Sequence, residues 1–169
     1  MSLLRQGPGR LRSSQGEAGR LQLDAYLPYR LSVASNAVSD LIARAYQDRF
    51  GLAVPQWRLI CVLAEDGALT QGQIVARTVM DKVTVSRAAQ GLLGRRLVTR
   101  VAHRADGRSH VLALSREGER LYAEIAPMAL AYEQALIAGL SPREVEDLKR
   151  LLLRLQATAM KLAETTSAD

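Results

Sequence analysis

The 169-residue chain is 48% hydrophobic and 24% charged, and this composition is typical of one ordinary globular domain. It excludes collagen-like, mucin-like and wholly disordered proteins, and the single cysteine cannot form an intrachain disulfide. No apolar run approaches the roughly 20 residues of a membrane span, and residues 1–20 lack an apolar signal-peptide core. We therefore expect a cytoplasmic protein.

The positive charge is concentrated in one internal stretch. The formal net charge is +6, and residues 77–108 have the same net charge, with eight Lys or Arg against two Asp. A cluster of this kind neutralises phosphates in nucleic-acid-binding proteins. An ordinary solvated surface explains the charge alone equally well.

The N-terminal half predicts a flexible arm and two helices. Residues 1–20 are rich in Gly, Ser, Gln and Arg and poor in apolar periodicity, which predicts a flexible basic arm. From Asp24, apolar residues recur at helical spacing over about 25 residues, and Gly51 ends this helix. A second, very apolar helix opens at Pro55 and ends at Gly67.

Two capped helices follow at close spacing. Thr70 and Gln73 have the spacing of a capping box, which starts a short third helix. Asp81 caps a fourth helix that runs toward Leu97. Two helices joined by a turn of about four residues predict a helix-turn-helix.

A β-hairpin is expected directly after this helix-turn-helix. Residues 99–102 and 111–114 are β-prone, and Asp106-Gly107 between them is a strong turn dipeptide. A hairpin in this place is a wing. Arg104 and Arg108 at its tip are either surface charge or side chains that reach DNA phosphates or a narrow minor groove.

Two long helices complete the chain. Ser115 can cap the first, which runs to about residue 136 and which Pro127 should kink or split. Ser141 and Glu144 form a capping box for the last helix. The apolar face of this last helix is too broad for a free surface helix, so we expect it to pack against the same face of a second copy.

The expected fold class is mainly α with a small β-hairpin wing. Residues 21–164 form a single domain in this prediction, with a winged helix-turn-helix DNA-binding lobe at about 53–115. The dimerisation helices are at about 22–50 and 116–164, and residues 165–169 are a tail.

The order of these elements resembles the MarR family of bacterial transcription regulators. The run Asp81-Lys82-Val83-Thr84-Val85-Ser86-Arg87 is similar to the D-K-x-T-V-S-R that opens the family's recognition helix. The family's wing has D-x-R and then L-T/S-x-x-G, and Asp106-Gly107-Arg108 and Leu114-Ser115-Arg116-Glu117-Gly118 are similar to them. The resemblance covers about residues 22–164.

Three positions depart from the family pattern. Gly91 and Gly94 lie within the recognition helix, where each costs up to about 1 kcal/mol relative to Ala. Ala105 takes a wing position at which many members have Arg.

The resemblance implies a homodimer that places one recognition helix in each half-site of a pseudo-palindromic operator in double-stranded DNA. Most members are repressors. Hydroxyl and guanidinium groups at the start of this helix can read base edges, and first-turn amides of the preceding helix can bind phosphate. The expected DNA contacts are Thr70, Gln71, Lys82, Thr84, Ser86, Arg87, Gln90, Arg104, Asp106 and Arg108.

Some residues of the basic segment have other expected roles. Arg77, with Lys82, is expected to contact phosphates, whereas Arg95 and Arg96 should interact with the C-terminus of the recognition helix through their charge. The resemblance implies that Arg108 enters the minor groove and that Asp106 orients a neighbouring Arg. Asp106 is equally explained as a turn residue.

The resemblance also implies a small anionic or aromatic effector, such as a phenolic acid or its acyl-CoA thioester. It would bind between the first two helices and the DNA-binding lobe and favour a dimer geometry that does not fit the operator. Polar residues on these apolar helices are the candidates, although each is also explained as core edge or surface. They are Tyr26, Tyr29, Arg30, Ser32, Ser35, Asn36, Trp57 and Arg58.

Other classes of function have less support in the sequence. Cys61 lies in an apolar run, where a thiol is usually inert, and a regulator that senses redox state through it is an alternative. His103 and His110 lack partners at metal-ligand spacing, so we expect no metal site. We also expect no other cofactor. The chain lacks the phosphate loops and nucleophile motifs of enzymes.

A winged-helix module that binds another protein is the second alternative, because a fold does not determine its function. Such a module would not need Arg87, Arg104 and Arg108 exposed along one face. RNA binding is less favoured, because the basic segment has no aromatic residue on which bases could stack.

Overall fold

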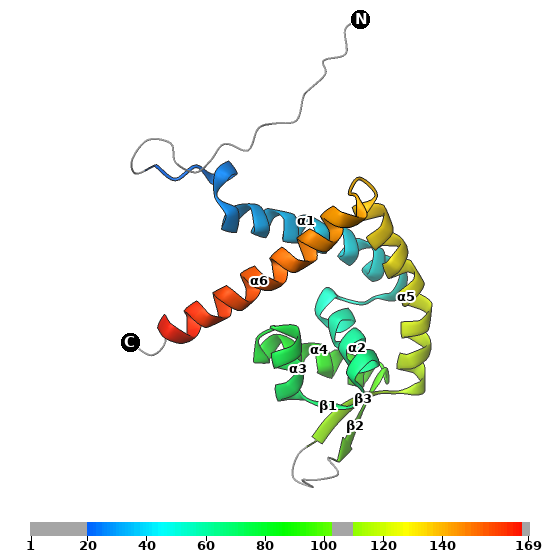
Figure 1. Ribbon diagram of the computed structural model, residues 1–169. Helices are drawn as coiled ribbons and strands as arrows, with labels where there is room; N and C mark the ends of the chain where they lie inside the picture. Colours follow the sequence, from blue (N-terminus) through cyan, green and yellow to red (C-terminus); the bar gives the residue numbers. More distant parts are fainter. Residues whose placement is uncertain (1–19, 103–109, 167–169) are drawn as a thin grey trace, which may run out of the picture. The chain divides into compact units, whose positions relative to one another are not determined.

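The computed structural model describes residues 20–102 and 110–166, in two compact units that divide between Ser115 and Arg116 (Figure 1). Most of the chain is helical, with one small antiparallel sheet, so the predicted fold class is confirmed. The predicted arm, the Asp106-Gly107 turn, Arg104 and Arg108 lie outside the described residues. The elements are η1 (Leu23–Ala25), α1 (Leu27–Phe50), α2 (Val54–Asp66), β1 (Leu69–Thr70), α3 (Gln71–Thr78), α4 (Lys82–Gly94), β2 (Val98–Ala102), β3 (His110–Leu114), α5 (Arg116–Ile137) and α6 (Pro142–Thr166).

Helix α1 begins and ends near the residues that the sequence indicates. Pro28 lies in its first turn, and Gly51 ends it in the left-handed conformation, with φ 60°. The Arg95 guanidinium, more than forty residues along the chain, donates to the Gly51 and Phe50 carbonyl oxygens, both at 2.8 Å. The prediction that Arg95 interacts with the C-terminus of its own helix α4 is therefore wrong, because its guanidinium binds the last carbonyls of α1 instead.

Helix α2 forms the centre of the first unit and packs against α3 and α4. Its very apolar sequence predicts a buried helix, and burial of one such side chain stabilises the fold by about 1.5–3 kcal/mol. The buried residues that α2, α3, α4 and the strands contribute include Leu59, Ile60, Leu63, Ile74, Val85, Ala89, Leu92, Val98 and Leu112.

Both helices of the helix-turn-helix begin at the predicted caps. At α3, the Gln73 amide donates to the Thr70 Oγ1 at 3.2 Å, and the Thr70 amide donates to the Gln73 Oε1 at 2.8 Å. At α4, the Thr84 amide donates to the Asp81 Oδ1 at 2.8 Å. The turn between them passes through Val79, whose φ of 55° is rare for a β-branched residue.

Helix α4 ends at Gly94, three residues before the predicted end at Leu97. Arg96 takes a left-handed φ of 57°. Its amide donates to the Leu93 carbonyl and the Leu97 amide to the Leu92 carbonyl, both at 3.0 Å. These two bonds form a Schellman motif, and both leucines at its ends, Leu92 and Leu97, are buried. Leu97 thus ends the helix and does not extend it.

The sheet has three antiparallel strands in the order β1-β3-β2. The predicted hairpin strands are present, with Val98 opposite Leu114 and Val101 opposite Val111. The third strand, β1, pairs Leu69 with Leu112 and was not expected. Two residues are too few to show a period of two in a sequence.

The second unit contains two long helices. Pro127 does not split α5, which is continuous across it. A proline removes the hydrogen bond to the carbonyl four residues earlier, here that of Ala123, and both residues are exposed, so water can satisfy that oxygen. Helix α6 begins with the predicted capping box, in which the Glu144 carboxylate accepts from the Ser141 amide at 2.7 Å. None of the described helices has the length and hydropathy that a membrane crossing requires.

Candidate nucleic-acid interface

Helix α4 has a buried face and an exposed polar face. Val85, Ala88, Ala89 and Leu92 are buried, and they recur at the three- and four-residue spacing of one helical face. The opposite face contains Arg87 and Gln90, which are exposed, and Ser86, which is half-buried, and Lys82 is exposed in the first turn of the helix. The fold thus brings together four of the residues predicted from the sequence to contact DNA.

Thr84 lies partly inside the cap of α4. Its hydroxyl donates to the Asp81 Oδ2 at 2.6 Å, in addition to the bond that its amide makes. These hydrogen bonds hold the pKa of the Asp81 carboxyl below its usual value, the Thr84 hydroxyl being the largest cause. Since the hydroxyl proton of Thr84 is already donated, a base contact by this residue would use its methyl group or its oxygen lone pairs.

A shallow groove of about 310 Å³ runs between the start of α2 and α4. Gln56 of α2 is one of its lining residues, and the Gln56 Oε1 accepts from the Ala53 amide at 3.0 Å. Its Nε2 faces α4, where a Cβ on Gly91 would lie only 2.4 Å away. The glycine that departs from the family pattern therefore makes room for Gln56. The lining residues are Ala53, Pro55, Gln56, Thr84, Arg87 and Ala88.

At the start of α3, the backbone amides of Thr70 and Gln71 were both expected to bind phosphate, but they differ in their hydrogen bonding. The Thr70 amide donates to the Gln73 side chain, so it is used by the cap. Gln71 is the exposed first residue of α3, and the first-turn amides of a helix have no acceptor within the helix. Of the two predicted phosphate contacts, the geometry favours Gln71.

Arg77 is held by acidic residues at the end of α2. Its Nε donates to the Asp66 Oδ2 at 2.9 Å, and its Nη2 lies 3.2 Å from the Glu65 Oε2. Hydrogen bonding and attraction to Asp66, and then attraction to Glu65, raise the pKa of Arg77. In this structure the Arg77 guanidinium forms ion pairs within the protein, and its phosphate contact stays a prediction.

Sequence reasoning missed Val83. It is 59% exposed, more than any other hydrophobic residue of α4, and the structure describes all of that helix. The available signal was its place in the Asp81–Arg87 run, where it precedes Arg87 by one helical turn. Of the wing, the structure describes β2 and β3, and predictions for Arg104, Asp106 and Arg108 lie outside the described residues.

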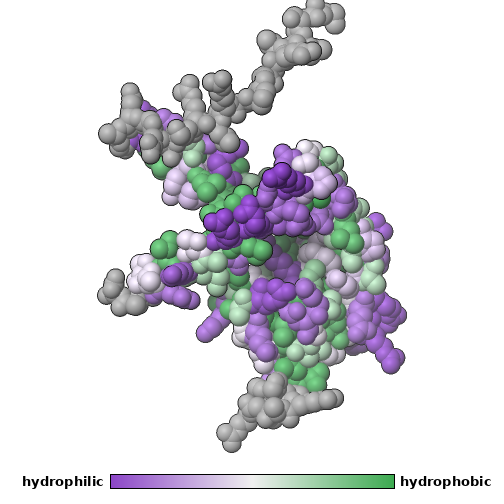
Figure 2. Space-filling view, in the orientation of Figure 1, coloured by the Kyte–Doolittle hydropathy of each residue, from purple (hydrophilic) through white to green (hydrophobic). Residues whose placement is uncertain are grey.

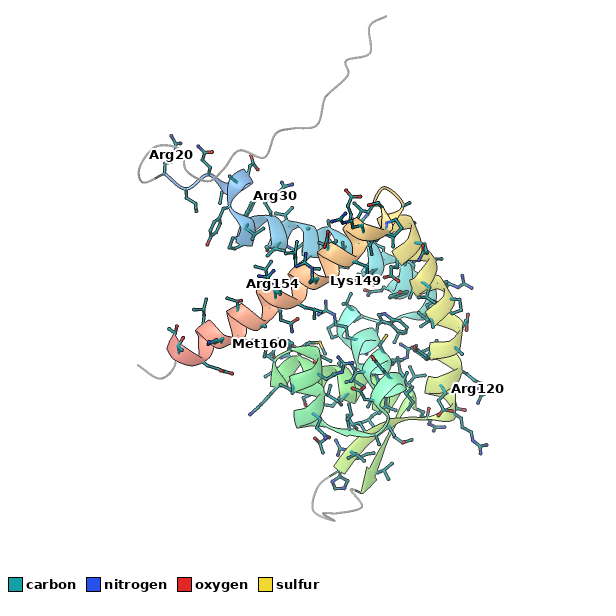
Figure 3. The ribbon with its side chains drawn as sticks, in the orientation of Figure 1. Arg20, Arg30, Arg120, Lys149, Arg154 and Met160 are labelled. Carbon is teal, nitrogen blue, oxygen red and sulfur yellow. The ribbon has the colours of Figure 1, made fainter. Side chains whose placement is uncertain are left out.

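The candidate effector residues do not share one environment. Trp57 is 8% exposed and packs against the buried Tyr46, with ring centroids 5.1 Å apart at 53°. It is a core residue of the first unit. The α1 candidates and the preceding Tyr26 are exposed, as is Arg58 on α2, and Figure 3 labels Arg30 near the start of α1. The exposed set is Tyr26, Tyr29, Arg30, Ser32, Ser35, Asn36 and Arg58.

The environment of Cys61 opposes redox sensing. Burial, and then the nearby negative charge of Glu65, raise the pKa of Cys61 to about 12. The thiolate is the reactive form, and almost none is present near neutral pH. Among the described residues, no group of three His, Cys, Asp or Glu side chains could hold a metal ion.

A capped helix-turn-helix with a polar recognition helix, followed by paired strands, defines a winged-helix DNA-binding protein. The MarR family model matches residues 50–109. The chain is 32% identical to a probable transcriptional regulator from Pseudomonas aeruginosa, with a TM-score of 0.70, over 79% of this chain and 99% of that one. The chain belongs to the MarR family of transcription regulators, a family of regulators and not of enzymes.

Two further relatives agree with this assignment. The HTH-type transcriptional regulator YwoH of Bacillus subtilis is 28% identical over 130 residues, which are 75% of this chain and 94% of YwoH. BpsR of Bordetella bronchiseptica, whose DNA binding is regulated by 6-hydroxynicotinic acid, is 25% identical with a TM-score of 0.75. That match covers 82% of this chain and 98% of BpsR.

Proposed function

We propose that this protein is a cytoplasmic, homodimeric repressor that binds a pseudo-palindromic operator and leaves it when a small aromatic acid binds. The observation that carries the proposal is the polar face of α4. Arg87 and Gln90 are exposed together on one face, with Lys82 exposed in the first turn, while the opposite face is buried in the unit's core. A guanidinium and an amide on the same face supply the bidentate groups that read guanine and adenine in the major groove.

Exposed apolar faces on the terminal helices support the dimer. On α6, leucines at helical spacing are each 39–46% exposed, and Figure 2 shows hydrophobic residues at the surface. A row of exposed leucines at helical spacing is typical of an interaction surface, and a two-fold dimer would cover it with its own copy. These leucines are Leu148, Leu151, Leu152 and Leu155.

A dimer would place two α4 helices one turn of DNA apart, which requires a pseudo-palindromic operator. The Gln71 amide would contact the phosphate backbone beside each major groove. In each wing, Arg108 would enter the minor groove, with Asp106 orienting a neighbouring Arg, as the family resemblance implies.

The effector proposal draws on BpsR, in which an aromatic carboxylic acid regulates DNA binding. In this chain Arg30 and Arg58 offer positive charge for a carboxylate, and Tyr26 and Tyr29 offer hydroxyl donors. An effector releases DNA if it binds more tightly to a dimer geometry that does not fit the operator.

Fluorescence anisotropy with the DNA upstream of the protein's own gene tests the proposal. We expect a saturable complex that is tighter than the complex with random DNA by roughly a thousandfold. The titration is repeated with aromatic acids and with their CoA thioesters, and one of them should dissociate the complex. Equal, weak and salt-sensitive binding to every duplex would contradict sequence-specific regulation and favour a protein partner.

A further inference from the structure

The most exposed hydrophobic residue of α4, the helix proposed to read DNA, is Val83. Val83 is 59% exposed on α4, among polar residues. It lies one helical turn before Arg87 and three residues before Ser86, so the three side chains share one face. This end of a recognition helix is the part that approaches base edges in a major groove.

The isopropyl group of Val83 limits what it can recognise. It has no hydrogen-bond donor or acceptor, so it cannot distinguish the amino, carbonyl and ring-nitrogen groups of the bases. The one apolar group that base pairs present in the major groove is the C5-methyl of thymine. The neighbouring Thr84 is less suited to this contact, because it is half-buried, whereas Val83 is exposed.

We propose that Val83 reads the C5-methyl group of one thymine in each operator half-site, and so determines part of the sequence specificity. This inference rests on the proposed function, since it requires α4 to enter the major groove. Burial of one methyl group from water strengthens binding by about fourfold, which is the expected preference at each half-site. Val83 thus adds a hydrophobic contact to the polar contacts of Arg87 and Gln90.

Deoxyuridine tests the contact directly, because it keeps the base pair and the O4 acceptor of thymine and lacks only the methyl group. The operator is first selected from a random-sequence duplex pool by the purified protein. Each thymine is then replaced by deoxyuridine, in both half-sites together, and anisotropy gives Kd for each duplex. For the wild type we expect one symmetric position at which Kd rises by about fourfold per half-site.

The Val83→Ala variant should lose this preference at that position and keep every other thymine preference. The variant should fold, because Val83 is exposed and alanine favours helix more strongly. Val79→Ala is the matched control, since Val79 is 64% exposed and precedes α4 in the turn. It should keep the wild-type pattern.

Three results would overturn the inference. One is a deoxyuridine profile that is identical in the wild type and in Val83→Ala. Another is loss of the preference in Val79→Ala alone, which would assign the contact to the turn. A third is a selected operator without any methyl-dependent position. Failure of the proposed function is distinct, because the random pool would then yield no preferred sequence.

Discussion

Substitution by alanine should change the free energy of unfolding differently at the two glycines of α4, Gly91 and Gly94. A Cβ on Gly94 would meet no atom within 4 Å. Gly94→Ala should therefore raise the free energy of unfolding by about 0.5–1 kcal/mol, the gain in helix propensity. At Gly91 the same Cβ would lie 2.4 Å from the Gln56 Nε2, so the amide has to move.

Movement of the Gln56 amide has a cost because its other end caps α2. Its Oε1 accepts from the Ala53 amide at 3.0 Å, and loss of such a bond costs about 1 kcal/mol. This loss cancels the propensity gain, so Gly91→Ala should be neutral or slightly destabilising. The two single variants should then differ by about 1 kcal/mol, the cost of that lost bond.

Urea unfolding followed by circular dichroism at one protein concentration measures these differences. A Gln56→Ala background provides the control, since it removes the obstructing amide. In that background Gly91→Ala should recover a gain similar to that of Gly94→Ala. Equal stabilisation by both glycine substitutions in the wild-type background would refute the proposed contact between Gln56 and α4.

Three further predictions concern the cap of α4, the link to α1 and the thiol. Hydrogen bonds lower the pKa of Asp81 in the folded protein, so this carboxylate contributes stability above its unfolded pKa of about 4 and loses it as pH falls through the lower folded value. Asp81→Ala should therefore lower Tm at pH 7, and the Tm of this variant should fall less than that of the wild type as the pH is lowered. Parallel curves of Tm against pH for the two proteins would contradict this. Arg95→Ala should lower the free energy of unfolding by about 1 kcal/mol, because it removes the bonds to Gly51 and Phe50. An equal loss in Arg96→Ala would contradict this assignment. Cys61 should react with a thiol reagent at pH 7 only after unfolding, and Cys61→Ala should respond to peroxide as the wild type does. Fast labelling of the native protein would contradict the assigned thiol environment.

The parts of the fold that sequence predicts depend on residues close together in the chain. The Thr70–Gln73 and Ser141–Glu144 capping boxes and the Asp81 cap each join residues three apart, so spacing alone reveals them. The order of helices and strands followed from these caps and from apolar periodicity.

The features that sequence does not predict depend on contacts between distant elements. Arg95 binds carbonyls 44 and 45 residues away, and Gly91 is explained by a side chain of α2. Likewise, Thr84 belongs to the expected motif, but only the structure shows that its hydroxyl binds Asp81. Only the structure shows that Val83 is the more exposed of the two residues. Motif matching locates the recognition helix, and packing decides which of its residues face outward.

Arg87→Ala provides the most direct test of sequence-specific reading by α4. Affinity for the selected operator and for a scrambled duplex is measured by anisotropy, with Arg77→Ala as a control that removes the same charge from a residue paired with Asp66 and Glu65. We expect Arg87→Ala to reduce the preference for the operator by about tenfold or more, and Arg77→Ala to preserve it. If both variants weakened binding to both duplexes equally, α4 would supply only electrostatic attraction, and the account would be contradicted.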